Sequence, residues 1–306
     1  MKKRIVLILL LALTLSTRQP SNAQAPASPV VKKIAFEVTN WNGISRQDEI
    51  FILDSPNAKP RRLVKGLKPA WSPTGEKLVF CTRTRRASGQ VEVINADGSG
   101  RMQLTQLRGG ACPSDWSTDG ERILATAYAQ GNPFIVTMSR DGKSITPLAH
   151  GYDARWSSDG SRIVFVRDAE TRGRHGSIWI ADADGKNAKQ VIEDDSPVLE
   201  ASWYPDGKSV AFASARDPKH KAAIFRVNID GSGLQEIASD KHFSLFFPFV
   251  SPDANQLVVD GIQSSDERGT AEFPRADKFV LLFDLHTNRI STLANGLHPS
   301  VLWEKH

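Results

Sequence analysis

One short motif recurs five times along this chain and constrains its fold more than any other feature. Each copy has the form Trp-Ser-x-Asp-Gly, with local departures, followed by a run of alternating apolar residues. The first positions of the five copies are Trp71, Trp116, Trp156, Trp203 and Val250. They are 45, 40, 47 and 47 residues apart, a period typical of radial arrangements of small β-sheets.

Each copy has the residues of a strand, a tight turn and a second strand. In the segment 157–160, Asp159 can accept hydrogen bonds from backbone amides, and Gly160 accepts the positive φ that closes a hairpin. A third strand, an Asp-Gly turn and a short fourth strand precede the next copy. Each repeat therefore supplies four strands, named a to d here. The Trp on strand a should face the neighbouring repeat, because one sheet alone cannot bury an indole.

The two ends of the chain together supply one more repeat. Residues 33–38, 49–53 and 61–64 resemble strands b, c and d, whereas 299–303 resembles a strand a that has no successor. We therefore predict an all-β fold over residues 33–306. It is a six-bladed β-propeller of four-stranded blades, closed by pairing of the C-terminal strand with the N-terminal blade.

The repeat also resembles a known family. The motif, together with segments such as Ile-Trp-Ile-Ala-Asp-Ala-Asp-Gly at 178–185, is similar to the repeat of the TolB-like, WD-repeat-like propellers over roughly residues 33–303. The resemblance implies the same six-bladed fold and, since TolB itself works in the periplasmic Tol-Pal system, an association with the cell envelope. TolB carries an α/β domain before its propeller, and we expect this chain to lack that domain.

The start of the chain resembles a secretory signal peptide. Three basic residues precede an apolar run of 11 residues, Ile5–Leu15, and small and polar residues follow. The pattern predicts a signal peptide of residues 1–23, cleaved after Ala23 or alternatively after Ala25, with a short linker at 24–32. The alternative is a membrane anchor, but a spanning helix needs about 20 apolar residues. We expect a periplasmic or secreted protein with no stable membrane anchor after cleavage.

Removing the signal changes the charge of the protein. The whole chain has a net charge of +5, but residues 1–25 hold four basic residues and no acidic one. The remainder has 35 basic and 34 acidic residues, a net charge of +1. A nucleic-acid partner is therefore not expected.

Two cysteines, Cys81 and Cys112, are the only ones in the sequence. An exported chain can form a disulfide. The spacing alone does not decide between this bond and two separate buried thiols.

Three of the predicted b–c loops form a basic arc. In propellers of this kind the b–c and d–a loops surround the central channel on one face. The loops at 83–89, 167–176 and 214–221 hold nine Lys or Arg residues and three Asp or Glu residues. Such an arc would attract acidic protein surfaces, phosphates or uronic-acid sugars, although ordinary solvated loop charge is the alternative. The binding candidates are Arg85, Arg86, Arg172, Arg174 and Lys219, with Phe243 and Trp41 as apolar contacts.

Five of the seven histidines fall in loops of the same face. They are His150, His175, His220, His242 and His298. Converging imidazoles can hold a metal or transfer protons, and the repeat resembles that of propeller lyases acting on acidic oligosaccharides. The alternative is that these are exposed loop histidines without a common role.

The last full repeat departs from the others. Val250 replaces Trp, and Ala254 replaces Gly. We expect Phe247 and Phe249 to fill the space that the missing indole leaves.

The sequence contains no Gly-x-Ser-x-Gly, His-Glu-x-x-His or phosphate-loop motif. We therefore expect a monomeric, non-enzymatic exported scaffold without a cofactor, which binds a protein or an anionic glycan of the cell envelope through the loop-rich face. The alternative is a lyase-like propeller enzyme that binds a metal or an acidic sugar through the five histidines.

Overall fold

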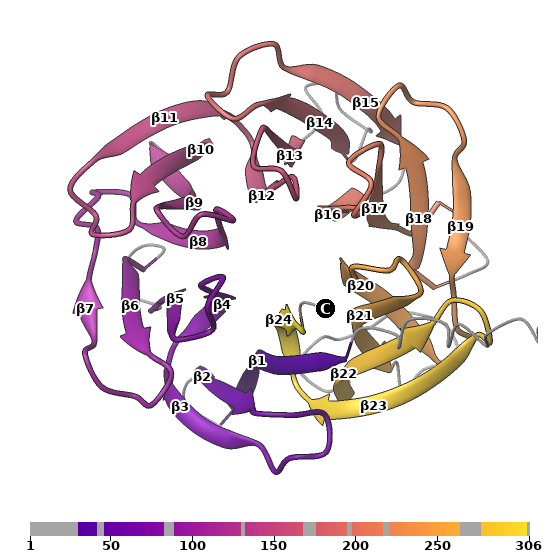
Figure 1. The fold of residues 1–306 in the computed structure, drawn as a ribbon, viewed down its shortest axis with the longest axis horizontal. Coiled ribbons are helices and arrows are strands. Elements are labelled where there is room, and N and C mark those ends of the chain that lie inside the picture. The colour runs from indigo at the N-terminus through magenta and orange to yellow at the C-terminus, as the bar shows by residue number, and fades with distance from the viewer. Residues whose placement is uncertain are drawn as a thin grey trace, which may run out of the picture.

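The computed structural model describes residues 30–41, 46–82, 89–129, 132–167, 176–194, 198–216, 221–263 and 277–304. This part of the chain forms six antiparallel sheets of four strands each, arranged as blades around a central axis (Figure 1). No helix long and apolar enough to cross a membrane occurs among these residues. The prediction of six four-stranded blades is confirmed.

The first three blades run as follows, each from the channel outward. Blade 1 consists of β24 (Leu297–Trp303), β1 (Val31–Trp41), β2 (Arg46–Leu53) and β3 (Arg61–Lys65). Blade 2 consists of β4 (Leu67–Trp71), β5 (Lys77–Cys81), β6 (Val91–Asn95) and β7 (Met102–Gln103). Blade 3 consists of β8 (Ala111–Trp116), β9 (Arg122–Ala129), β10 (Asn132–Ser139) and β11 (Ile145–His150).

The other three blades follow the same order. Blade 4 consists of β12 (Tyr152–Trp156), β13 (Arg162–Arg167), β14 (Gly176–Asp182) and β15 (Lys189–Asp194). Blade 5 consists of β16 (Val198–Trp203), β17 (Ser209–Ser214), β18 (Ala223–Asn228) and β19 (Gln235–Ala238). Blade 6 consists of β20 (Phe243–Val250), β21 (Gln256–Gln263), β22 (Asp277–Asp284) and β23 (Arg289–Asn295).

The two ends of the described chain close the ring. Strand β24 pairs antiparallel with β1, with Val301 opposite Ile34 and Trp303 opposite Val31. The predicted closure is confirmed. The ladder between β1 and β2 extends to Trp41, whereas the sequence predicted that this strand b ends at residue 38. A hydrogen bond from the Thr39 hydroxyl to the Asp48 carboxylate, 3.0 Å long, joins the two strands in this extension.

The cores lie between neighbouring blades, as the recurring Trp predicted. Trp71, for example, packs against Ile50 and Ile52 of blade 1. The four motif indoles are 5–8% exposed, and three of them also lie under a cation from strand b of the preceding blade. These pairs are Lys33 over Trp71, Arg122 over Trp156 and Arg162 over Trp203, with 5.6, 4.5 and 4.9 Å from the cation to the ring centre. Each blade therefore depends on its neighbours for burial.

A disulfide joins Cys81 at the end of β5 to Cys112 on β8. Of the two alternatives that the spacing left open, the structure has the bond rather than two thiols. It connects blade 2 with blade 3 where both strands approach the b–c and d–a loops.

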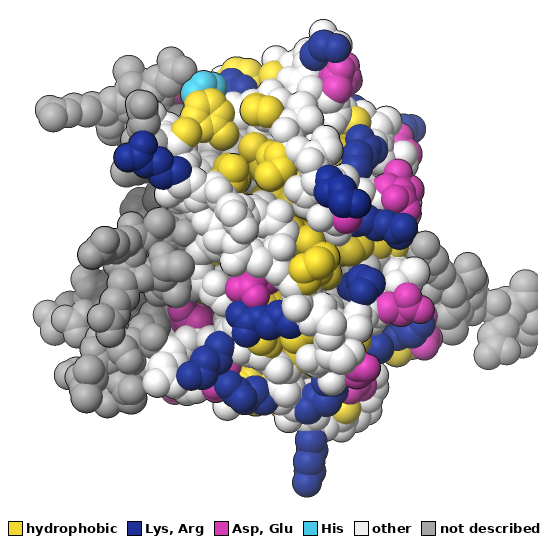
Figure 2. All heavy atoms as spheres, turned by 90° about the vertical axis from the view of Figure 1, so that its left-hand side faces the viewer, with side chains coloured by type: hydrophobic (Ala, Val, Ile, Leu, Met, Phe, Trp, Pro, Cys, Tyr) yellow, Lys and Arg dark blue, Asp and Glu magenta, His cyan; other side chains and the backbone are white. Residues whose placement is uncertain are grey.

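The flank of the ring has a mixed surface. Figure 2 shows basic and acidic side chains interspersed over the side where β7 and β11 lie. Paired charges on outer strands include Arg62 with Glu49 and Arg101 with Glu92. No single sign of charge dominates this view.

Candidate binding site in the central channel

A β-bulge interrupts strand a of every blade near its loop end. The register of the a–b pairing shifts between Leu67 and Ala70, for example, and between Tyr152 and Arg155. The other four pairings shift at the corresponding place. A bulge leaves one or two residues outside the ladder and turns a side chain away from the sheet. Here the released side chains line the channel.

Five of the six bulges hold a non-glycine residue at positive φ. These residues are Lys68, Asp153, Glu200, Phe247 and His298, with φ of 51°, 52°, 32°, 51° and 50°. Such a conformation costs a non-glycine residue about 1–2 kcal/mol, and strain of this kind concentrates at binding and catalytic sites. The sixth bulge, in blade 3, holds Ser114 after Pro113 instead.

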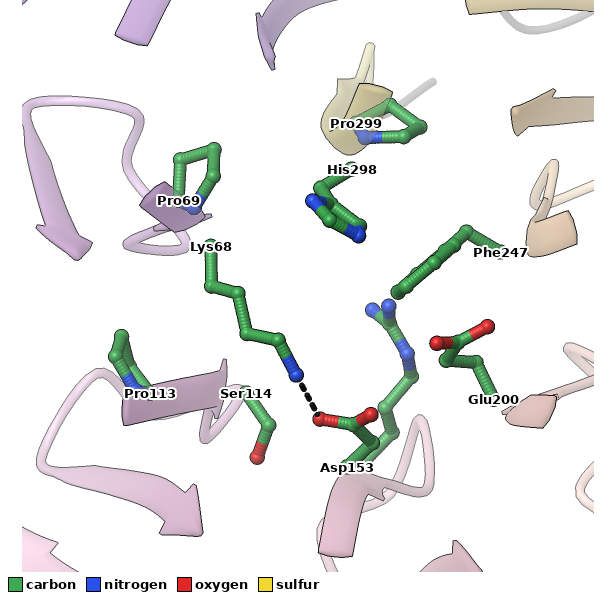
Figure 3. A pocket seen from close by; sticks show the side chains of 10 residues that line it. Lys68, Pro69, Pro113, Ser114, Asp153, Glu200, Phe247, His298 and Pro299 are labelled. Carbon is green, nitrogen blue, oxygen red and sulfur yellow. Dashed lines mark hydrogen bonds and ion pairs between the residues drawn. The ribbon is translucent and has the colours of Figure 1, made fainter. Parts of the chain in front are cut away.

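These residues surround one small cavity of about 30 Å³. Figure 3 shows their side chains converging from separate blades, with Lys68 reaching across to Asp153. The full lining is Lys68, Pro69, Pro113, Ser114, Asp153, Arg155, Glu200, Phe247, His298 and Pro299.

Two ion pairs hold charged residues that line the channel. The Lys68 ammonium lies 2.7 Å from an Asp153 carboxylate oxygen and so joins blade 2 to blade 4. Burial opposes both charges, but the attraction between them outweighs it. As a result the pKa of Lys68 is raised and that of Asp153 is lowered. The second pair joins Nδ1 of His298 to Oε2 of Glu37, 2.8 Å apart. Burial disfavours the imidazolium, but the bond to Glu37 prevails and raises the pKa of His298.

Two buried carboxyl groups have no such cation. Glu200 is 8% exposed and Asp260 is 1% exposed. Oε2 of Glu200 and Oδ1 of Asp260 have no hydrogen-bond partner. Burial, reinforced by Asp153, raises the pKa of Glu200 well above its usual value. Burial also raises the pKa of Asp260 to about 7, although the backbone N–H of His298 donates to its other oxygen.

Arg155 extends across the channel from blade 4. Its guanidinium lies 3.9 Å from the ring centre of Phe249 in blade 6. Burial lowers the pKa of Arg155, while Asp115 is the carboxylate that most opposes this shift. Phe249 is otherwise packed in the core between blades 6 and 1, as expected.

The expectation that Phe247 fills the same core is wrong. The bulge in β20 turns its ring into the channel, where it meets the His298 ring edge-on with 4.4 Å between ring centres. The pattern of alternation fails here because a bulge inverts the faces of the residues that follow it.

Most loop residues selected from the sequence lie outside the described residues: Arg85, Arg86, Arg172, Arg174, Lys219, His175 and His220. Trp41 ends β1, and its side chain also lies outside them. Phe243 is half-buried against Phe279, with 5.5 Å between ring centres, so it also stabilises blade 6.

The three described histidines of the five have separate surroundings. His150 ends the outer strand β11 and packs on Phe134, with 4.1 Å between ring centres. His242 is exposed before β20. Only His298, of these three, lines the cavity. Within the described ranges, no group of three or more His, Cys, Asp or Glu residues is arranged to hold a metal ion.

Lys68, Asp153 and Glu200 escaped the sequence analysis, although one signal could have found them. In blades 2, 4, 5 and 6 the bulge residue stands three positions before the motif's first residue. Comparison of this one position across the repeats gives Lys68, Asp153, Glu200 and Phe247, side chains of differing chemistry at one place in the blade. Lys68, Phe247 and His298 are in addition followed by proline.

No family model matches the chain. Among curated proteins, the Tol-Pal system protein TolB of Anaeromyxobacter dehalogenans (strain 2CP-C) is 28% identical over 138 residues, which is 42% of this chain and 31% of that protein. The protein TolB homolog of Chlorobium luteolum is 32% identical over 162 residues, 50% of this chain and 35% of that protein. The matches thus span about a third of these relatives.

Solved structures share the fold at lower identity. The crystal structure of TolB from Acinetobacter baumannii has a TM-score of 0.67 at 20% identity, covering 89% of this chain and 66% of that one. A putative TolB from Agrobacterium tumefaciens has a TM-score of 0.67 at 18% identity, covering 91% and 100%. An oligogalacturonate lyase in complex with manganese has a TM-score of 0.53 at 12% identity, covering 85% and 74%.

The closed ring and its lined channel define the chain as a six-bladed β-propeller. The sequence matches narrow this class further. In fold, and in sequence over 42–50% of its length, the chain is similar to TolB proteins.

Proposed function

We propose that this protein is an exported scaffold of the cell envelope that binds a protein partner at the loop end of its channel. The observation that carries the proposal is the set of bulge residues, which places an ammonium, two carboxyl groups, an aromatic ring and an imidazole around one cavity. Such a mixture on a rigid frame suits recognition of protein side chains. The relatives named Tol-Pal system protein TolB support a role in the cell envelope.

The described part of the basic arc is already engaged within the protein. Arg167 lies 4.0 Å above the Trp179 ring, and Arg216 lies 4.7 Å above the Phe225 ring. The Lys221 ammonium donates to the backbone oxygen of His242. These contacts fix the positions of the three cations at the loop end of the channel.

The loop residues complete the proposal around the channel. Arg85, Arg86, Arg172, Arg174 and Lys219 would steer an acidic partner surface toward the ring. Trp41 and the exposed part of Phe243 would supply apolar contact at the rim.

Export is part of the same proposal. Residues 1–23 would direct the chain to the periplasm, where it would act as a monomer. N-terminal sequencing of the protein from a periplasmic extract should begin at Gln24, or at Pro26 if cleavage follows Ala25. An intact N-terminus would overturn the export proposal.

Site-specific photo-crosslinking tests the binding face. A crosslinking side chain at His242, exposed at the loop end, should capture an envelope protein in living cells. The same side chain at Thr74, exposed in the turn at the other end of strand a, serves as the control. Capture from Thr74 and not from His242 would refute the proposed face.

A further inference from the structure

We propose that the channel cavity binds a carboxylate group through the guanidinium of Arg155. The inference rests on the proposed function and deepens it, because an acidic side chain of the protein partner would supply this group. A small free carboxylate has the same chemistry and is the other source. The cavity is the one lined by the bulge residues.

The first argument is that the guanidinium of Arg155 has no polar partner. Arg155 lines the cavity and is half-buried. Its guanidinium lies 3.9 Å from the ring centre of Phe249, a separation that only the face of the ring allows. The five N–H groups point outward in the plane of the guanidinium, so this contact leaves them available. Within the described ranges the guanidinium donates no hydrogen bond and forms no ion pair.

The strongest acidic neighbour of Arg155 does not take up these donors. Among carboxylates, Asp115 most favours the charged form of Arg155. The two oxygens of Asp115 accept instead the backbone N–H groups of Trp116 and Trp156, each at 2.9 Å. Burial therefore outweighs the carboxylates and lowers the pKa of Arg155. A bound carboxylate would supply the compensation that the protein itself lacks.

The second argument is the charge of the cavity wall. The charged or acidic residues that line it are Lys68, Asp153, Arg155, Glu200 and His298. Lys68 neutralises Asp153, because its ammonium lies 2.7 Å from a carboxylate oxygen. Burial favours the neutral form of Glu200. The wall therefore carries more positive than negative charge.

The third argument is that the accessible polar groups of the wall are mostly hydrogen-bond donors. The Lys68 and His298 side chains are 28% and 22% exposed, and Figure 3 shows both extending into the cavity. Lys68 gives one of its three N–H groups to Asp153. His298 bonds Glu37 through Nδ1, so Nε2 can donate to a ligand when the ring is charged. Oε2 of Glu200, in contrast, is fully buried. A ligand that accepts hydrogen bonds therefore suits this wall.

The three cations also act together on a single carboxylate of the protein. Burial opposes the charge of Asp153, but Lys68, Arg155 and His298 all attract it, and its pKa is lowered. These cations come from blades 2, 4 and 1. A second carboxylate among them would gain the same attraction, because Lys68 alone already pairs with Asp153.

The size of the cavity suits the two oxygens of one carboxylate. A water molecule needs about 10–15 Å³ of such space, and the cavity has about 30 Å³. The planar fork of a guanidinium donates to both oxygens of a carboxylate at once. A phosphate, with four oxygens, is larger. The geometry therefore favours a carboxylate over a phosphate.

Titration of the purified exported protein with propionate tests the inference. Calorimetry at pH 7, with the ionic strength held constant by sodium chloride, should show saturable binding. Neutral propionamide has a similar shape and should bind at least tenfold more weakly. Equal binding of the two compounds would overturn the inference. Inorganic phosphate that binds as tightly as propionate would overturn the assignment to a carboxylate.

Two substitutions of Arg155 locate the site. Arg155→Gln removes the charge and should weaken propionate binding at least tenfold, so unchanged binding would refute the site. Arg155→Lys keeps the charge but loses the fork, and it should weaken propionate binding three- to tenfold. If Arg155→Lys binds propionate with unchanged affinity, the guanidinium is not required and the proposal is wrong.

A matched variant controls for damage to the propeller frame. Arg162→Lys makes the same change at the turn end of blade 4, where the guanidinium lies 4.9 Å from the ring centre of Trp203. It should bind propionate as the unmodified protein does, and a loss equal to that of Arg155→Lys would overturn the site. The comparison of propionate with propionamide uses the unmodified protein, so it decides the inference even if an Arg155 variant does not fold.

Peptides decide the source of the carboxylate. A glutamate tripeptide with blocked ends that binds more tightly than propionate, and loses that binding in Arg155→Gln, supports a partner side chain. Propionate binding as tightly as the peptide supports a free carboxylate. Carboxylate binding without protein capture at His242 would refute the proposed function alone, whereas capture without carboxylate binding would refute only this inference.

Discussion

The two ends of strand a differ in how residue type relates to backbone geometry. At the turn end, Ser-x-x-Gly or a close variant recurs, and Ser117, Ser157 and Ser251 donate to Asp119, Asp159 and Asp253 at 2.5–2.6 Å. At the loop end, five bulges share a positive φ that favours glycine, yet none of the five holds one. Residues at the turn end suit their backbone, whereas residues at the loop end strain it. The turn end of strand a therefore belongs to the rigid frame of the propeller, and the loop end belongs to the candidate binding site.

Blade 3 should show the largest effect at the loop end. Its bulge lacks a positive-φ residue, and the Cys81–Cys112 bond holds its strand a to blade 2. Replacing both cysteines by serine should lower the free energy of unfolding by about 3 kcal/mol, because the bond closes a chain segment of 31 residues. Urea unfolding measures this, with the reduced unmodified protein as control. An unchanged midpoint would show that the bond does not form.

The ion pairs of the two ends should differ in strength. Lys68→Met at the loop end should cost about 2 kcal/mol, because it leaves Asp153 in the channel without its cation. Lys186→Met removes the partner of Asp184 in a turn, where the lysine side chain is 78% exposed, against 28% for Lys68. That loss should be too small to detect, because solvent screens an exposed ion pair. Thermal unfolding measures the loss of stability in both variants. Equal losses would contradict the expected difference between the two ends of strand a.

The carboxyl groups at the two ends of strand a should affect the stability of the protein in different pH ranges. Raised pKa values of Asp260 and Glu200 mean that the folded protein keeps protons that the unfolded chain gives up above about pH 4. Stability should therefore fall by about 1–2 kcal/mol from pH 4.5 to 7.5. At the turn end, hydrogen bonds from Ser157 and Ser161 lower the pKa of Asp159 to about 2, so stability should also fall below pH 4.

Unfolding measured across pH should thus show maximal stability between about pH 4 and 5. Asp260→Asn should flatten the decline toward pH 7.5. Ser157→Ala should change only the fall in stability below pH 4. A plateau from pH 5 to 8 in the unmodified protein would contradict the carboxyl assignments at the loop end.

The smallest effect concerns the one turn that departs from its motif. Ala254 has a φ of 61° at the place where Gly160 has 69°. Ala254→Gly should raise stability by about 0.5–1 kcal/mol, and Gly160→Ala should lower it by about 1 kcal/mol. Chemical denaturation of both variants provides the check. A loss of stability in Ala254→Gly would mean that blade 6 gains more from the methyl group than its backbone loses.

The difference between the two ends of strand a explains which features could be predicted from the sequence. Trp71, Trp116, Trp156 and Trp203 recur because each blade needs the same interblade packing, so the fold, the blade count and the pairing at Trp303 followed from the repeat. The candidate binding site did not follow from the repeat, because it depends on where β-bulges interrupt the pairing of strands a and b. Phe247 was assigned to the core for this reason, and Glu200 drew no notice. The Cys81–Cys112 bond likewise required the distance between two blades.

The pairing of β24 with β1 also fixes an order of events during folding. Strand β1 is made early, but its channel-side neighbour β24 is made only after the other five blades. Until those seven residues arrive, the first blade has three strands and an open edge. The native ring therefore cannot close before β24 has been synthesised. Both strands must also lie on the same side of any membrane, and a chain truncated before residue 297 would leave the edge of β1 unpaired and open to pairing with another chain.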